Sequence, residues 1–321
     1  QVVVASGAKP FEQFFCEAFL EPDDGVLIFS PHFPTYEPNL MRRGARAVLQ
    51  PLRVENQFRP RADDVERFLR TDPQPRAIFL NSPHNPTGGV ADPADLEQIA
   101  EVVRGRDIVI FSDEPYCHMV WQGRHASILE QPGMLEQTVA AYTFSKSYSM
   151  SGWRIGFAVA HPDVVRAFGT LINTTASCSP PFVQLAAQAA LEQDRATRDD
   201  YMDRFRVKVQ RLARGLSQIE GVAVTPPAGT FYVFADVRAL CDRFGITSHG
   251  LAMYLLEGAD DDFGVACLGG ECFGAAGQGF IRFSCAEPDE RIDQAVAFLE
   301  IALARADRMA AYLGDHPDHR G

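Results

Sequence analysis

The chain has 321 residues, 46% hydrophobic and 22% charged, so it can bury a sizeable core and is neither disordered nor fibrous in composition. Its net charge of −12 argues against nucleic acid as a partner, because an acidic chain repels phosphates. Seven scattered cysteines without a C-x-x-C pair argue against a disulfide framework or a zinc site. Since no apolar run reaches the ~20 residues that span a bilayer, we expect a soluble cytoplasmic protein without a membrane partner.

Short apolar runs alternate with segments of helical period in the first half of the chain. This alternation predicts an α/β fold with a mostly parallel sheet that helices cover on both faces. We expect strands at residues 2–5, 25–29, 47–52, 77–81, 108–112, 139–144 and 156–160. We expect helices between them at residues 10–19, 35–43, 62–69, 93–104 and 163–172.

The pattern changes in the second half of the chain. Residues 181–216 are helical in pattern and increasingly charged, and two strands around a Pro/Gly turn follow residue 221. We expect next a helix, a glycine-rich stretch, a strand and a last helix, at 248–257, 268–279, 280–284 and 291–312. The change predicts a large α/β domain at 1–200 and a smaller α+β domain at 201–321, with a disordered tail.

Polar clusters follow three of the expected strands. They are N-S-P-H-N-P-T-G-G at 81–89, D-E-P-Y at 113–116 and T-F-S-K at 143–146. Ligands of open parallel sheets bind beyond the carboxyl ends of the strands. The three clusters therefore predict one site at that edge.

Lys146 is the pivotal residue of this site. A lysine at the end of an apolar strand is partly desolvated, which favours a neutral amine able to form a Schiff base with an aldehyde. An isolated lysine is more often exposed at the surface. Here Arg154 follows in S-G-W-R-I-G, and its guanidinium with the hydroxyl groups of Thr143 and Ser145 suits a phosphate. The pattern S-K-x5-G-x-R-x-G has a chance frequency of roughly 10⁻⁶ per start position.

This segment resembles the cofactor-attachment signature of the fold-type I, class I/II pyridoxal-phosphate-dependent aminotransferases, the aspartate aminotransferase superfamily. The resemblance runs from S-G-A-K at 6–9 to F-I-R-F-S at 280–284. It implies a large cofactor-binding domain, pyridoxal 5'-phosphate as cofactor and a homodimer. It also implies that Lys146 is the Schiff-base lysine and, once released, the general base and acid of the 1,3-proton shift.

The same resemblance gives roles to the other polar clusters. Asp113 would pair with the pyridine nitrogen and keep the ring an electron sink, although an aspartate in a turn after a strand is common by itself. Tyr116 resembles the tyrosine that hydrogen-bonds the cofactor's phenolic oxygen, and a core aromatic is its alternative. Asn85, in H-N-P-T-G, resembles the asparagine that contacts the same oxygen, and it is also a candidate for substrate binding.

Further cofactor contacts come from two segments near the start of the chain. Phe33 occupies the position of the aromatic that stacks on the pyridine ring, with core packing as its alternative and Tyr36 as a rival. Gly7, Ala8 and Lys9 resemble the turn that binds the cofactor phosphate at a helix N-terminus. Lys9 could add charge there, reach substrate or remain solvated.

Arg282 resembles the family arginine that holds the substrate α-carboxylate, and a structural ion pair is its alternative. No second arginine can be placed to bind an acidic side chain, so we favour neutral or aromatic amino acids as substrates. Members of the family normally carry several dozen residues before the S-G turn. We therefore expect that the N-terminal arm is missing from this sequence.

These residues together predict an aminotransferase that moves an amino group between an L-amino acid and a 2-oxo acid by ping-pong chemistry. Two alternatives remain. The first is a β-eliminating carbon–sulfur lyase or a cyclising enzyme of the same superfamily, against which Tyr116 argues mildly. The second is the cofactor-binding effector domain of a transcription regulator.

Overall fold

The computed structural model describes all residues from Gln1 to Gly321, and the chain forms two compact units. Unit 1 consists of Gln1–Phe29, Thr35–His84 and Gly89–Asp203. Unit 2 consists of Ser30–Pro34, Asn85–Gly88 and Arg204–Gly321.

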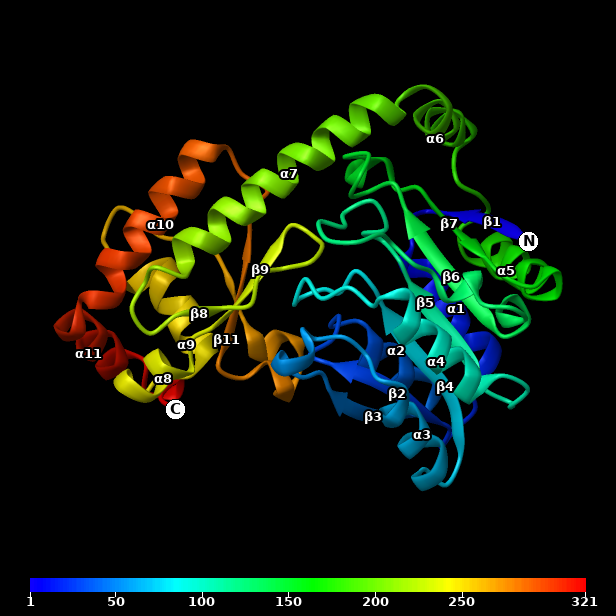
Figure 1. Ribbon diagram of the computed structural model, residues 1–321, viewed down its shortest axis with the longest axis horizontal. Helices are drawn as coiled ribbons and strands as arrows, with labels where there is room; N and C mark the ends of the chain where they lie inside the picture. Colours follow the sequence, from blue (N-terminus) through cyan, green and yellow to red (C-terminus); the bar gives the residue numbers. More distant parts are fainter. The chain divides into compact units, whose positions relative to one another are not determined.

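Unit 1 is built on a seven-stranded sheet (Figure 1). Its strands are β1 (Val2–Ala5), β2 (Gly25–Ser30), β3 (Arg46–Pro51), β4 (Pro75–Asn81), β5 (Val109–Asp113), β6 (Thr138–Thr143) and β7 (Gly156–Val159). They lie in the order β1-β7-β6-β5-β4-β2-β3. Strands β2, β4, β5 and β6 pair in parallel, whereas β7 runs antiparallel to β6 and β1. The predicted mostly parallel sheet is confirmed.

Helices cover both faces of this sheet. They are α1 (Lys9–Phe19), α2 (Tyr36–Arg43), α3 (Ala62–Thr71), α4 (Pro93–Val103), α5 (Pro162–Thr175) and α6 (Pro181–Gln193). Ile78 of β4 and Ile110 of β5 belong to the core that α3 and α4 share, while α4 lies in front of the sheet in Figure 1. The residues that follow them, Phe79 and Phe111, pack instead on Phe15 of α1, with ring centroids 5.5 and 5.4 Å apart. Such alternation is what a strand buried on both faces requires.

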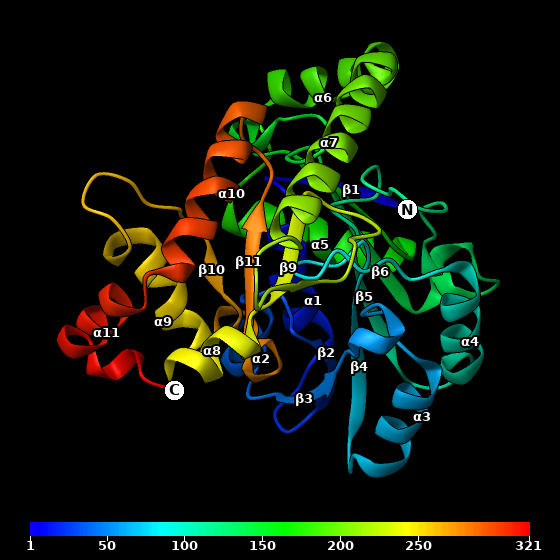
Figure 2. The same cartoon turned by 60° about the vertical axis from the view of Figure 1, so that its left-hand side comes forward.

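Unit 2 contains a smaller antiparallel sheet (Figure 2). Its strands, in the order β10-β11-β9-β8, are β8 (Ala223–Val224), β9 (Tyr232–Asp236), β10 (Leu268–Gly269) and β11 (Phe280–Ser284). The long helix α7 (Arg195–Leu216) begins in unit 1 and ends in unit 2. The remaining helices are α8 (Arg238–Phe244), α9 (Ser248–Met253), α10 (Asp289–Ala304) and α11 (Ala306–Asp315). The predicted α+β character of this part of the chain is confirmed.

Two expectations for the C-terminal part are wrong. The last helix is interrupted at Arg305, whose backbone leaves the helical region and whose Nη1 donates to the carbonyl of Ala259 at 2.8 Å. The tail is ordered as a short 3-10 turn, Pro317–His319, because the carbonyl of His319 accepts from the backbone N–H of Thr247. None of the helices combines the length and the apolar character that crossing a bilayer requires.

Candidate active site

The carboxyl ends of β4, β5 and β6 lie side by side in unit 1. Asn81 is in register with Asp113, and its side-chain amide donates to the Asp113 carbonyl at 2.8 Å. Lys146 follows the end of β6 by three residues, and its Nζ lies 5.5 Å from the ring centroid of Tyr116. An amine, a carboxyl group and a phenol from two polar clusters therefore meet at this edge, as expected for strands that run in parallel.

Asp113 is a buried carboxyl group with a specific hydrogen-bond partner. Its side chain accepts from Oη of Tyr36 at 2.7 Å. Burial raises the pKa of Asp113 to about 6, the Tyr36 hydrogen bond opposes that rise, the nearby Glu114 adds to it, and Lys146 opposes it. A cationic partner would stabilise the carboxylate further, because an opposite charge in a desolvated site favours the ionised form.

Tyr36 has a different place from the one the sequence suggested. The sequence makes Tyr36 a rival to Phe33 for an aromatic role, but its ring packs edge-on against Phe79 and the residue is 2% exposed. Its hydroxyl group is directed at Asp113, which lies 77 residues later in the chain. Burial and the neighbouring carboxylates raise the pKa of Tyr36 well above its usual value, so it acts as a neutral donor.

A second buried carboxylate supports the turn that carries Asp113 and Tyr116. Glu114 is 1% exposed and accepts from the hydroxyl groups of Ser112 and Ser127, at 2.7 and 2.6 Å. Its other oxygen lies 2.8 Å from Nε2 of His125. Because consecutive residues of an extended chain point to opposite sides, this network holds the turn from the side away from the Asp113 carboxyl. The residues of this network were not among those predicted from the sequence.

The turn between β1 and α1 approaches Arg154 closely. A Cβ added at Gly7, where φ is +101°, would lie 2.7 Å from Nη2 of Arg154, and that nitrogen donates to the carbonyl of Ser6 at 3.2 Å. A Cβ added at Gly156 would lie 3.0 Å from the nitrogen of Ala8. The two glycines thus leave room beside a guanidinium and the first turn of an 11-residue helix that has no side-chain N-cap. This combination binds anions.

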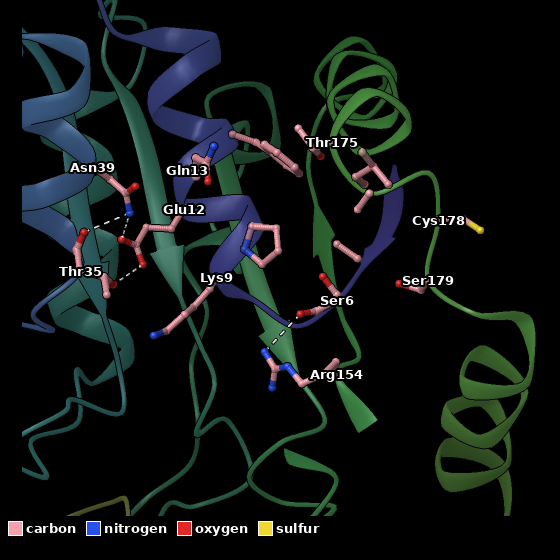
Figure 3. Close-up of a pocket in the computed structure, with 15 residues that line it drawn as sticks. Ser6, Lys9, Glu12, Gln13, Thr35, Asn39, Arg154, Thr175, Cys178 and Ser179 are labelled. Carbon is pink, nitrogen blue, oxygen red and sulfur yellow. Dashed lines mark hydrogen bonds between the residues drawn. The ribbon is translucent and has the colours of Figure 1, made fainter. Parts of the chain in front are cut away.

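A pocket of about 490 Å³ opens beside this turn (Figure 3). Lys9 and Arg154 both line it, and Figure 3 shows the Arg154 contact with Ser6 at its edge. The hydroxyl groups expected to join Arg154 lie at the end of β6 and just after it, where Oγ1 of Thr143 donates to Oγ of Ser145 at 2.9 Å. Arg154 itself has a left-handed φ of 52°, a conformation that is uncommon for non-glycine residues.

Glu12 forms the other side of the pocket and was not predicted. It is 3% exposed, and its carboxyl group accepts from Oγ1 of Thr35 at 2.9 Å and from the side-chain amide of Asn39. Burial and the neighbouring Asp113 raise the pKa of Glu12 to about 7. Position 12 is in the first turn of α1, where acidic residues are common and the sequence offers no sign that this glutamate is buried.

Phe33, Asn85 and Arg282 belong to unit 2. Nη1 of Arg282 donates to Oδ1 of Asn85 at 2.8 Å, so the structure brings together two residues that are 197 positions apart. No carboxylate pairs with Arg282, and its Nε is buried without an acceptor. The ion pair considered as its alternative is therefore absent.

Comparisons with known proteins agree with one another. The family model described as "Aminotransferase class I and II" matches residues 1–299. An aspartate aminotransferase of Pyrococcus abyssi is 32% identical over 310 residues, which cover 94% of this chain and 76% of the relative. An arginine–pyruvate transaminase of Pseudomonas aeruginosa is 33% identical over 307 residues, which cover 96% of this chain and 75% of the relative.

Solved structures give the same result. The crystal structure of an aromatic aminotransferase from Pyrococcus horikoshii has a TM-score of 0.85 and 31% identity to this chain, and the match covers 99% of this chain and 80% of the other. An aspartate aminotransferase of Thermus thermophilus, solved with maleate, has a TM-score of 0.85 at 28% identity, and the match covers 94% of this chain and 75% of the other. The lyase and regulator alternatives are not favoured by these matches.

Proposed function

Since the chain belongs to the class I and II aminotransferase family, and is an aminotransferase that uses pyridoxal phosphate, we propose that the sheet edge around Lys146 in unit 1 is its active site. The observation that carries the proposal is the meeting of Lys146, Asp113 and Tyr116 at the ends of neighbouring strands. We assign unit 1 as the large cofactor-binding domain and unit 2 as the small C-terminal domain.

The residues at this edge fit a phosphorylated pyridine aldehyde. The turn at Gly7 and Ala8, which Arg154 approaches too closely for a Cβ at position 7, would hold the phosphate together with Arg154 and the hydroxyl groups of Thr143 and Ser145. Lys9 would add positive charge on the same side. Lys146 would hold the aldehyde carbon through its amine.

Pyridoxal phosphate, when bound, supplies a carbonyl carbon for the amino group and a ring that withdraws electrons from the substrate Cα. Asp113 would keep the ring nitrogen protonated, and the hydrogen bond that Tyr36 donates to Asp113 favours its ionised form. Nζ of Lys146 would accept the proton from the substrate Cα and deliver a proton to the former aldehyde carbon in the same half-reaction, and the second half-reaction would run these two transfers in reverse. Tyr116 would donate to the phenolic oxygen of the cofactor.

Three residues of unit 2 have roles that the family resemblance implies. Phe33 would stack on the pyridine ring, and Asn85 would donate to the phenolic oxygen. Arg282 holds the substrate α-carboxylate, which orients the Cα–H bond for removal of its proton. The hydrogen bond between Arg282 and Asn85 supports a shared role for these two residues.

The amino donor is proposed to be neutral or aromatic. A panel of amino donors, each with and without a 2-oxo acid acceptor, tests both the reaction and its substrate class. An aminotransferase sustains 2-oxo acid formation only when the acceptor is present, and Lys146→Ala abolishes it. Continuous release of ammonia and pyruvate from cysteine conjugates without acceptor would instead establish the lyase.

A homodimer is supported by an apolar groove of about 590 Å³ in unit 1. Leu185 of α6 and Val2 of β1 line it and are 65% and 58% exposed. Exposed apolar patches of this kind mark interaction sites. Light scattering of the holoenzyme should give twice the 35.4 kDa chain mass, and Leu185→Glu should give the monomer.

A cytoplasmic location is supported by seven cysteines that are all free thiols. The net charge of −12 supports small molecules rather than nucleic acid as ligands.

A further inference from the structure

The guanidinium group of Arg282 lies over two aromatic rings of unit 2. Its central carbon is 4.1 Å from the ring centroid of Tyr232 and 4.8 Å from that of Phe273. Tyr232 is the first residue of β9, and Phe273 ends the 3-10 turn Gly270–Phe273. Both side chains are buried. Neither residue has a role in the site described so far.

The register of the small sheet explains how one of these rings reaches Arg282. Arg282 of β11 is paired with Phe234 of β9, and Tyr232 stands two residues away from Phe234 on the same face. Phe280 shares this face and stacks on Phe234 at a centroid distance of 4.8 Å. The face of the sheet that carries Arg282 is therefore aromatic, while Ile281 and its neighbours pack in the core on the other face.

The guanidinium carbon of Arg282 lies over the rings of Tyr232 and Phe273. An arginine that stacks on aromatic rings uses its weakly hydrated planar faces and keeps its in-plane N–H donors for hydrogen bonds. Nη1 donates to Asn85, and Nε is buried without an acceptor. A buried N–H group without an acceptor is costly in a folded protein. It points to an oxygen that a ligand supplies.

We propose that Tyr232 and Phe273 form an aromatic clamp that fixes the plane of the Arg282 guanidinium for the substrate α-carboxylate. The proposal rests on the proposed function, in which Arg282 binds that carboxylate. A carboxylate pairs with two parallel N–H groups only when it lies in the guanidinium plane. With the plane fixed in advance, less side-chain freedom is lost when substrate binds. Tyr232 and Phe273 are thus positioning residues that act through Arg282.

The test measures binding of two probes to the holoenzyme by calorimetry. 3-Phenylpropionate has a carboxylate and no amino group, so it binds without reacting, and 3-phenylpropanamide lacks the charge. Phe273→Leu and Tyr232→Leu should each weaken 3-phenylpropionate binding about tenfold, which is ~1.4 kcal/mol, and leave the amide unaffected. Phe273→Tyr and Tyr232→Phe retain a ring and should bind as the wild type does.

Phe280→Leu is the matched control. It removes a ring from the same sheet face, but that ring lies under the guanidinium of Arg238 and stacks on Phe234. If the clamp acts as proposed, Phe280→Leu lowers the thermal unfolding midpoint as much as Phe273→Leu does and leaves 3-phenylpropionate binding intact. A purely structural role would weaken binding equally in both variants and would overturn the proposal.

Arg282→Gln separates the clamp from the function on which it rests. If Arg282→Gln weakens 3-phenylpropionate binding and the two leucine variants do not, the clamp is wrong and the role of Arg282 stands. If Arg282→Gln leaves the binding unchanged, the carboxylate role of Arg282 is wrong, and the clamp fails with it.

Discussion

Removing the hydroxyl group of Tyr36 should change how the stability of the cofactor-free protein depends on pH. Tyr36 Oη donates at 2.7 Å to Asp113, whose pKa burial raises from 3.8 to about 6. The hydrogen bond favours the ionised carboxylate. In Tyr36→Phe the pKa of Asp113 must therefore rise further.

The size of the effect follows from linkage between protonation and folding. Because the pKa of Asp113 is higher in the folded than in the unfolded protein, its contribution to stability is complete below pH 3.8 and is lost as the pH rises through about 6. A rise of about two units in the pKa of Asp113 corresponds to a change of ~3 kcal/mol in the free energy of unfolding. A hydrogen bond to a charged group is worth ~1.5–3 kcal/mol, so the variant should continue to lose stability for another ~1–2 pH units.

Urea unfolding of the cofactor-free protein, repeated from about pH 5 to about pH 9, measures this difference. The free energy of unfolding of Tyr36→Phe should fall below that of the wild type by an additional ~1.5–3 kcal/mol over this range. Tyr254→Phe is the control, because Tyr254 is buried and donates to the carbonyl of Ala302 instead of to a carboxylate. A deficit of Tyr36→Phe that is the same at every pH would refute the reasoning.

Three further predictions concern single charged groups. Arg154→Ala should weaken binding of pyridoxal phosphate to the cofactor-free protein by ~10- to 100-fold and leave binding of pyridoxal unchanged. An equal loss of affinity for both ligands would contradict the role of Arg154 in binding the phosphate. Glu12→Gln removes a carboxyl group whose pKa is raised from 4.5 to about 7, so the wild type loses stability between these pH values and the variant does not. In urea unfolding, the free energy of unfolding of the variant should therefore gain up to ~3 kcal/mol relative to the wild type as the pH rises from 4.5 to about 7. A difference between the two proteins that is constant with pH would contradict the raised pKa. Glu114→Ala leaves His125 without its buried partner and should lower the free energy of unfolding by ~3–5 kcal/mol, whereas Asp261→Ala, which breaks an exposed ion pair, should leave it nearly unchanged.

The fold of unit 1 could largely be predicted because its strands carry strong patterns. Continuous apolar runs define β2 and β4, and Pro93 with an aspartate N-cap marks the start of α4. The break between α10 and α11 could not be predicted, since no glycine or proline occurs there. It depends on Arg305 reaching the carbonyl of Ala259, a contact between residues 46 positions apart.

Site residues at the ends of strands could also be predicted, because parallel strands deliver them to one edge. The partners that act on them could not. Tyr36 begins a helix and reaches Asp113 only through the packing of α2 against the sheet, and Glu12 is buried by contacts with Thr35 and Asn39 from another helix. Each depends on tertiary neighbours rather than on local spacing.

The central claim is that Lys146 carries the cofactor, and the chain makes it simple to test because its only lysines are Lys9, Lys146 and Lys208. The holoenzyme is reduced with borohydride and digested, and each lysine peptide is weighed by mass spectrometry. We expect a phosphopyridoxyl group on the peptide that contains Lys146 and on neither of the other two lysine peptides. The same group on Lys9 or Lys208, with Lys146 unmodified, would contradict it.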